Sequence, residues 1–136
     1  MLDLKKSNYA EVAEAGFEFE LKLPGTDEPS GAFVTVRGDN SKTVKAYSRK
    51  KYSEFRAREQ MQKRRGKEAD EMTIDEAEDL SIEAAIVRVI SWKGITEGST
   101  VVEFNKENAT RIFRDHPWIR EQVMEVAQDI LNFRPE

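Results

Sequence analysis

The stretch that decides the fold is GFEFELKLPGTDEPSGAFVTVRG, residues 16–38. Its first part alternates apolar with charged side chains, which is the period of a half-buried β-strand. The Pro-Gly and Pro-Ser-Gly clusters of residues 24–31 are typical of a turn, and the β-branched segment that follows predicts a second strand. The sequence therefore predicts an antiparallel β-hairpin over about residues 17–37. Because an isolated hairpin is marginally stable in water, it needs helices on its apolar face or an edge-to-edge partner.

Four helices are expected after the hairpin, over about residues 41–67, 73–92, 105–115 and 117–131. Asp39, Asn40 and Ser41 are each able to cap the first of these helices, and Thr73 with Glu76 forms a capping box for the second. The third helix ends before Pro117, which suits the first turn of the fourth because its missing N–H has no helical partner there.

The first two predicted helices differ in how apolar they are. After Phe55 the first offers only Ala57 and Met61 to a core, so we expect its second half to project into solvent. From Leu80 onward the second is apolar on nearly all sides, so we expect it to be the central buried element. The predicted fold class is α+β, one domain over residues 1–136, with an N-terminal β-hairpin packed on a mainly helical domain.

Composition limits the class of protein. Hydrophobic residues make up 38% and charged residues 35% of the 136 residues, which is typical of a soluble protein. No apolar run approaches the roughly 20 residues that a membrane-spanning helix needs, so we expect no contact with a membrane. The first 20 residues lack the apolar core of a signal peptide, which predicts a cytoplasmic location.

The residues argue against an enzyme. The chain has no cysteine and one histidine, His116, so thiolate chemistry is excluded and most imidazole chemistry lacks partners. The glycines form no phosphate-binding loop. Asp75, Glu76, Glu78 and Asp79 resemble a magnesium or glycosidase cluster, but acids in a first helical turn are explained by the helix dipole. We therefore expect no catalytic site, no metal and no cofactor.

Charge is segregated along the chain. Residues 42–67 hold eleven Lys or Arg against two Glu, a net +9, and residues 68–83 hold eight acids and no base, a net −8. Two interpretations stay open: adjacent helices neutralise each other, or the basic surface of one copy meets the acidic surface of the next, head to tail. The candidate interaction surface consists of Lys45, Arg49, Lys50, Arg56, Lys63, Arg64, Arg65, Glu71, Asp75, Glu76, Glu78 and Asp79.

A third interpretation is a small nucleic-acid-binding or regulatory module that uses the basic helix over residues 42–67. The adjacent acidic block argues against it, because that block repels phosphates over about a Debye length. Nucleic acid is therefore the less favoured partner. Trp92 and Trp118 are candidate anchors, in the core or at an interface.

The layout resembles the tail assembly chaperones of long-tailed, siphophage-type bacteriophages or prophages. The resemblance lies in LPGTDEPSGAFVTVRGDNS (23–41), in ISWKGI (90–95) and in FNKENATRIFRDHPWIREQVMEVAQDILNF (104–133), with the Trp-Lys-Gly-Ile, Asn-Ala and Pro-Trp-Ile steps as its motifs. It implies a non-enzymatic protein that coats and solubilises the tape measure protein, helps to recruit tail tube protein, and self-associates, with spirals around the tape measure as the implied form. It also implies a location in the cytoplasm of the bacterial host and absence from the mature virion. The resemblance assigns no binding residues.

Overall fold

The predicted hairpin is present and is extended by a third strand. The computed structural model of the chain describes residues 1–66 and 72–135. Strands β1 (Phe17–Lys22), β2 (Pro29–Val36) and β3 (Val89–Lys93) form an antiparallel sheet in the order β1-β2-β3. Phe19 pairs with Val34, and Val34 pairs with Trp92, so one apolar row crosses all three strands.

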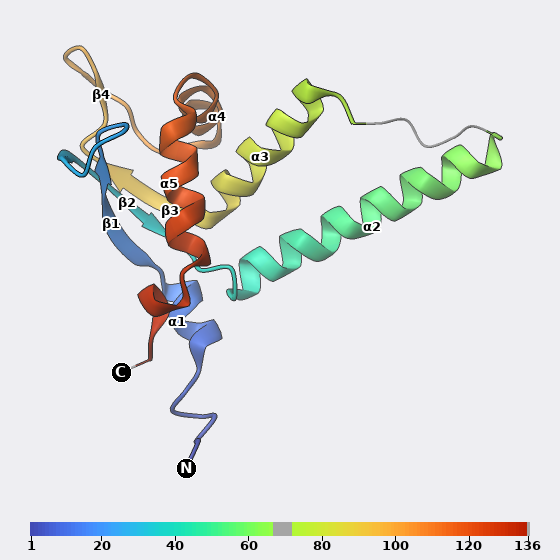
Figure 1. Cartoon of the computed structure of the whole chain (residues 1–136), viewed down its shortest axis with the longest axis horizontal. Helices are drawn as coiled ribbons and strands as arrows, with labels where there is room; N and C mark the ends of the chain where they lie inside the picture. The colour runs from blue at the N-terminus through green and yellow to red at the C-terminus, as the bar shows by residue number, and fades with distance from the viewer. Residues whose placement is uncertain (67–71, 136) are drawn as a thin grey trace.

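Helices cover the apolar face of this sheet (Figure 1). Helices α3 (Ile74–Arg88), α4 (Lys106–Asp115) and α5 (Pro117–Gln128) pack on one another, and α5 also contacts β1 and β2. Leu21, Val34, Ala85, Phe113 and Val123 are among the core residues, each exposed by 1% or less. The α+β class is confirmed, with the hairpin beside a mainly helical region.

Short elements close the two ends of the domain. Helix α1 (Tyr9–Ala15) lies beside the 3-10 turn η1 (Ile130–Phe133), and both chain termini lie at this end in Figure 1. At the other end, strands β4 (Thr96–Glu97) and β5 (Thr100–Val101) form a small hairpin of their own.

Helix α2 (Lys42–Arg64) is different, because it projects from this body as a long arm (Figure 1). Val44 is its one buried side chain, and residues 52–61 are all exposed. The expectation that the second half of this helix projects into solvent is therefore confirmed. The helix ends at Arg64, three residues before its predicted end at about residue 67, which itself lies outside the described residues.

Three expectations about the helices were wrong. The second helix ends at Arg88, not at residue 92, because residues 89–93 take up the free hydrogen-bonding edge of β2 as a strand. The same helix is not buried all round: within α3 only Ile82 and Ala85 are buried, because α2 diverges from it and leaves one side open. The last helix ends at Gln128, where the chain tightens into η1. Helix α1 was not predicted at all.

Candidate interaction site

The base of α2 is held firmly by the body. Ser41 caps the helix and is fully buried, and its hydroxyl oxygen accepts a hydrogen bond of 3.1 Å from the N–H of Val44. The N–H of Ser41 in turn donates to the carbonyl oxygen of Gly38 at 2.9 Å. The projecting part of the helix is therefore mounted on an ordered, buried first turn.

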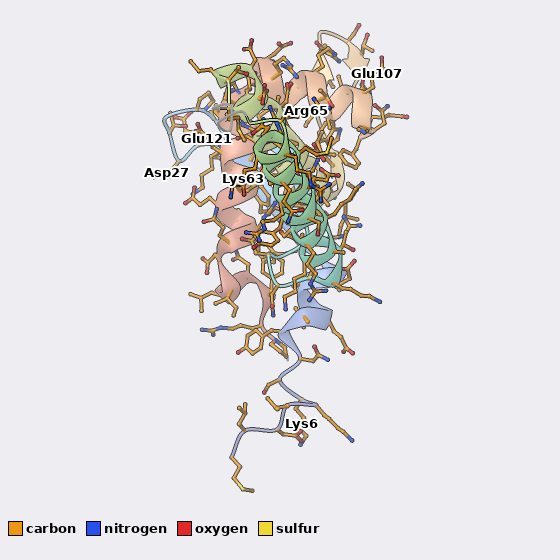
Figure 2. The ribbon with its side chains drawn as sticks, turned by 90° about the vertical axis from the view of Figure 1, so that its right-hand side faces the viewer. Lys6, Asp27, Lys63, Arg65, Glu107 and Glu121 are labelled. Atoms are coloured by element: carbon orange, nitrogen blue, oxygen red, sulfur yellow. The ribbon has the colours of Figure 1, made fainter. Side chains whose placement is uncertain are left out.

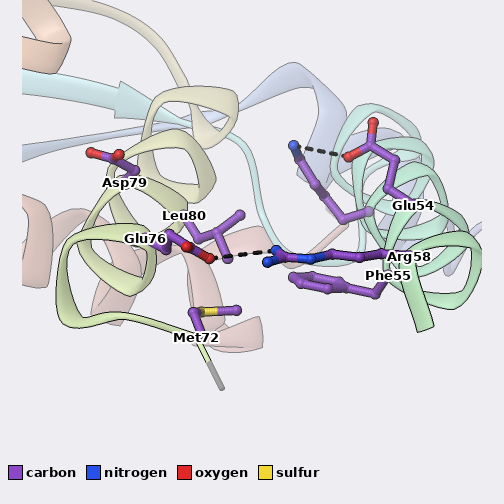
Figure 3. Close-up of a pocket in the computed structure, with 8 residues that line it drawn as sticks. Glu54, Phe55, Arg58, Met72, Glu76, Asp79 and Leu80 are labelled. Atoms are coloured by element: carbon purple, nitrogen blue, oxygen red, sulfur yellow. Dashed lines mark hydrogen bonds and ion pairs between the residues drawn. The ribbon is translucent and has the colours of Figure 1, made fainter. Parts of the chain in front are cut away.

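The diverging helices α2 and α3 enclose a groove of about 400 Å³ (Figure 3). We call it the α2–α3 groove. Apolar side chains of Phe55, Met72 and Leu80 line it, and Phe55 and Met72 are exposed by 39% and 43%. Charged residues complete the lining: Lys51, Glu54, Arg58, Glu76 and Asp79. The groove thus has an apolar floor between residues of both charges on α2 and acidic residues on α3.

Ion pairs join the two walls of this groove. Lys51 Nζ lies 2.8 Å from Glu83 Oε1, and Arg58 Nη1 lies 3.4 Å from Glu76 Oε2 (the second pair is drawn in Figure 3). The hydrogen bond with Glu83 raises the pKa of Lys51 above its ordinary value. Lys51 also pairs with Glu54 one turn along its own helix, at 3.3 Å. These exposed pairs set the geometry of the walls but contribute little each to stability.

The acidic residues of the candidate surface are largely engaged within the chain. Besides the pair that Glu76 makes, Arg114 Nη2 of α4 lies 2.8 Å from Asp79 Oδ1, and Arg114 Nη1 lies 3.9 Å from Glu78 Oε1. The hydrogen bond with Asp79 raises the pKa of Arg114. Asp75 is exposed, and Glu71 lies outside the described residues.

The basic residues of the candidate surface stay apart from these acids. All seven are exposed, and across residues 1–66 and 72–135 no ion pair involves any of them: Lys45, Arg49, Lys50, Arg56, Lys63, Arg64 and Arg65. Figure 2 views the molecule from the end to which α2 points, with Lys63 and Arg65 at the tip. The structure therefore pairs the acids of the candidate surface with Arg58 and Arg114, and Lys51 pairs with Glu54 and Glu83; sequence reasoning left all three basic residues out of the surface. Little in the sequence favours including these three residues. The one pattern that involves any of them is the seven-residue spacing of Lys51 and Arg58, which places those two on one helix face.

A second groove, of about 590 Å³, lies on the other side of α3. We call it the α3–α5 groove. Leu80 lines both grooves, and Ala84 and Met124 continue the apolar surface toward α5. All three are partly exposed. A helix that is apolar nearly all round but covered on one side offers the rest of its surface to a partner.

A model of the YdaY prophage protein family matches residues 45–136 of this chain. The chain belongs to the YdaY prophage protein family. The matched part of this YdaY-family chain starts at the end of the first turn of α2 and includes both grooves and every residue of the candidate surface. No curated protein and no solved structure gives a significant match.

The two tryptophans of this YdaY-family chain lie in different settings. Trp92 is 9% exposed, its indole N–H donates to the carbonyl oxygen of Val102 at 2.8 Å, and its ring packs edge-on against Phe104 and Phe113. Trp118 is half-buried, with its ring 6.5 Å from that of His116. Trp92 is thus a core residue, and Trp118 lies at the surface of the core.

Across residues 1–66 and 72–135, no cluster of three or more His, Asp or Glu side chains is placed to hold a metal ion. In the same residues, no helix has the length and apolar character needed to cross a bilayer.

Proposed function

We propose that this prophage protein is a non-enzymatic tail assembly chaperone that coats and solubilises the tape measure protein and helps to recruit tail tube protein. It acts in the cytoplasm of the infected or lysogenic host and is absent from the mature virion. Membership of a prophage protein family supports the setting, and the resemblance of the sequence to tail assembly chaperones supports the role.

The observation that carries the proposal is the α2–α3 groove. Its apolar floor runs between two diverging helices, which suits an amphipathic helix laid along it. The apolar stripe of such a helix covers Phe55, Met72 and Leu80, and its charged flanks meet the ion-paired residues of the groove, among them Arg58 and Glu76. A tape measure protein, which the resemblance implies to be long and helical, offers many such stripes. Covering them one by one keeps the partner soluble.

The test is co-expression of the tagged protein with the tape measure protein encoded by the same prophage. We expect the wild-type chain to keep the tape measure protein in the soluble fraction and to retain it on affinity resin after nuclease treatment. In the double variant F55S/M72S we expect at least a tenfold loss of retained tape measure protein, because both apolar side chains leave the groove. The two residues are partly exposed, so the variant keeps its core.

The matched control is Tyr52→Ser, which removes an aromatic side chain that is 66% exposed on the same helix and does not line the groove. We expect Y52S to retain the tape measure protein as the wild type does. An insoluble tape measure protein in the presence of the wild-type chain contradicts the proposal. Equal retention by wild type and F55S/M72S contradicts the assignment of the groove.

A second candidate function, nucleic-acid binding through α2, is supported by one observation. The seven exposed basic residues of the candidate surface have no acidic partner within the described residues, so they are accessible to phosphates. Binding of this kind predicts a gel-shift with duplex or single-stranded DNA that weakens steeply as salt rises. The absence of any shift at low salt removes this candidate.

A further inference from the structure

The charge of the folded chain is divided between arm and body. Helix α2 holds nine basic and two acidic residues, a net +7, so the rest of the chain has a net charge of −4 − 7 = −11. Among residues 1–66 and 72–135, Lys51 and Arg58 are the basic residues of α2 that pair with acids. The outer part of α2 with its C-cap, residues 52–65, is called the arm below. The arm holds five basic and two acidic residues, a net +3, and points away from the body (Figure 1).

The α3–α5 groove has the opposite character to the arm. Its floor is apolar, from Leu80, Ala84 and Met124, and Glu121 and Glu125 of α5 stand on its rim. Both glutamates are exposed, and neither makes an ion pair with any described residue. The one basic residue of the lining is Arg120, whose guanidinium donates to the carbonyl oxygen of Phe113 at 3.4 Å.

The tip of the arm provides a matching set of side chains. Met61 is 49% exposed, and the exposed Arg64 and Arg65 follow three and four residues later on the same side of the helix, so an apolar side chain lies next to two basic ones. The arm cannot reach the groove of its own chain, because α3 lies between α2 and α5 and the arm points away from α5 (Figure 1). A second molecule has to supply the contact.

We propose that the arm of one copy docks in the α3–α5 groove of a second copy. Met61 packs on the floor against Leu80 and Met124, and Arg64 and Arg65 pair with Glu121 and Glu125. The contact replaces the head-to-tail pairing with residues 75–79 that the charge pattern left open, because Glu76, Glu78 and Asp79 already pair within the chain. A nucleic acid fits less well as the partner of the arm. The acidic body repels phosphates, and the phosphate backbone of DNA offers no apolar surface to Met61.

This contact is heterologous, since the arm and the groove are different surfaces. Each copy therefore offers one arm and one groove, and the contact propagates into an open chain or closes into a ring. It goes beyond the chaperone proposal, because it uses the far side of α3 and needs no tape measure protein. The two proposals can be tested separately. F55S/M72S is expected to assemble like the wild type although it loses the tape measure protein. The variants that lose assembly can still be tested for retention of the tape measure protein.

The experiment is sedimentation velocity of the purified full chain at low salt, over a range of concentrations. The arm variant is M61S/R64S/R65S, and the groove variant is E121K/E125K. The control variant, L4S/K5S/K6S, also replaces one exposed apolar and two exposed basic side chains, but in the N-terminal segment, where Figure 2 labels Lys6 far from the arm. Circular dichroism verifies that every variant folds.

We expect the wild type and the control to form species larger than a dimer. The arm variant and the groove variant are each expected to sediment as monomers, with the association constant reduced at least tenfold. When the two variants are mixed in equal amounts, one intact arm meets one intact groove, so a heterodimer forms and grows no further. A monomeric wild type overturns the proposal, whether or not it binds DNA. So does assembly of either variant at wild-type strength, or a mixture that stays monomeric.

Discussion

The carboxylate of Glu14 in α1 accepts two hydrogen bonds from Thr43 in the first turn of α2. One comes from the backbone N–H at 3.0 Å and the other from the threonine hydroxyl. Residues 42–45, the first turn of α2, contain no acid, so Glu14 supplies from another helix the negative charge that a helix N-terminus favours. The donated hydrogen bonds from the Thr43 hydroxyl and then its N–H lower the pKa of Glu14, and the guanidinium of Arg37 adds a smaller effect.

The first prediction concerns the pH dependence of this contact. Because the pKa of Glu14 is lower in the folded state than in the unfolded state, the stabilisation is present at neutral pH and is lost as pH falls through the folded-state pKa. We expect E14Q to lower the free energy of unfolding at pH 7 by about 1 kcal/mol, a small value because the carboxylate is partly exposed. Urea unfolding at pH 7 and pH 3 measures this, and the difference from wild type shrinks at pH 3. The control is E11Q, which is expected to change little; a constant difference at both pH values contradicts the prediction.

The second prediction compares two glycines with positive φ. Gly94 has φ +82°, and a Cβ there would lie 2.6 Å from the carbonyl oxygen of Gly31, whereas Gly98 has φ +61° and open space around it. We expect Gly98→Ala to cost about 1 kcal/mol from backbone strain alone. Gly94→Ala is expected to cost about 2 kcal/mol more, because backbone atoms must move to relieve the clash. Thermal unfolding measures the loss of stability in both variants. Equal losses would contradict the prediction, because they would show that the backbone of β2 moves at Gly31 without a cost in free energy.

The third prediction compares the two tryptophans. Trp92→Ala removes a buried ring and its hydrogen bond to Val102, so we expect a loss of about 4 kcal/mol in the free energy of unfolding. Trp118→Ala removes a half-buried ring, so we expect a loss of about 1 to 2 kcal/mol. Chemical denaturation checks the order of the two variants. A larger loss for Trp118 than for Trp92 would contradict the placement of Trp92 in the core.

The fourth prediction concerns the edge of β1. The side-chain amide of Gln122 in α5 donates to the carbonyl oxygen of Lys22 and accepts from its N–H, both at 2.9 Å. This amide takes the place of a neighbouring strand at that residue. We expect Gln122→Ala to cost about 1 to 2 kcal/mol and to speed hydrogen exchange at the amide of Lys22. Gln128→Ala, at the exposed end of the same helix, is the control and is expected to leave that exchange rate unchanged.

The parts of the fold that could be predicted are those specified locally. The hairpin over residues 17–37 follows from alternation within each strand, and the caps at Ser41 and Thr73 follow from their own turns. Helix α1 is seven residues long, too short for a periodic signal, although Asn8 does cap it as its residue type favours. Strand β3 could not be predicted, because residues 89–93 also continue a helical pattern, and the deciding factor is the open edge of β2 more than fifty residues away in sequence.

The candidate site divides in the same way. The sequence identifies which residues of α2 and α3 are charged, and it correctly indicates that the outer half of α2 is exposed. The partners of those charges depend on how the helices cross. Arg114 pairs with Asp79 across 35 positions of sequence, and no local pattern points to that pair. The α2–α3 groove depends on the divergence of α2, and the α3–α5 groove depends on how α3 packs against α5. Neither arrangement is set by the sequence pattern of one helix.

Helix α2 is held in its first turn by Ser41, Thr43 and Val44, and beyond that turn by the partly exposed ion pairs of Lys51 and Arg58 with α3. Its 23 residues extend for about 35 Å at the helical rise of 1.5 Å per residue. A change in the orientation of the first turn therefore moves the whole outer part of the helix. A rotation of roughly 10° about that turn displaces the tip by about 6 Å, which is greater than one helical turn. Side chains that never touch a partner, Glu14 above all, therefore control where the tip points.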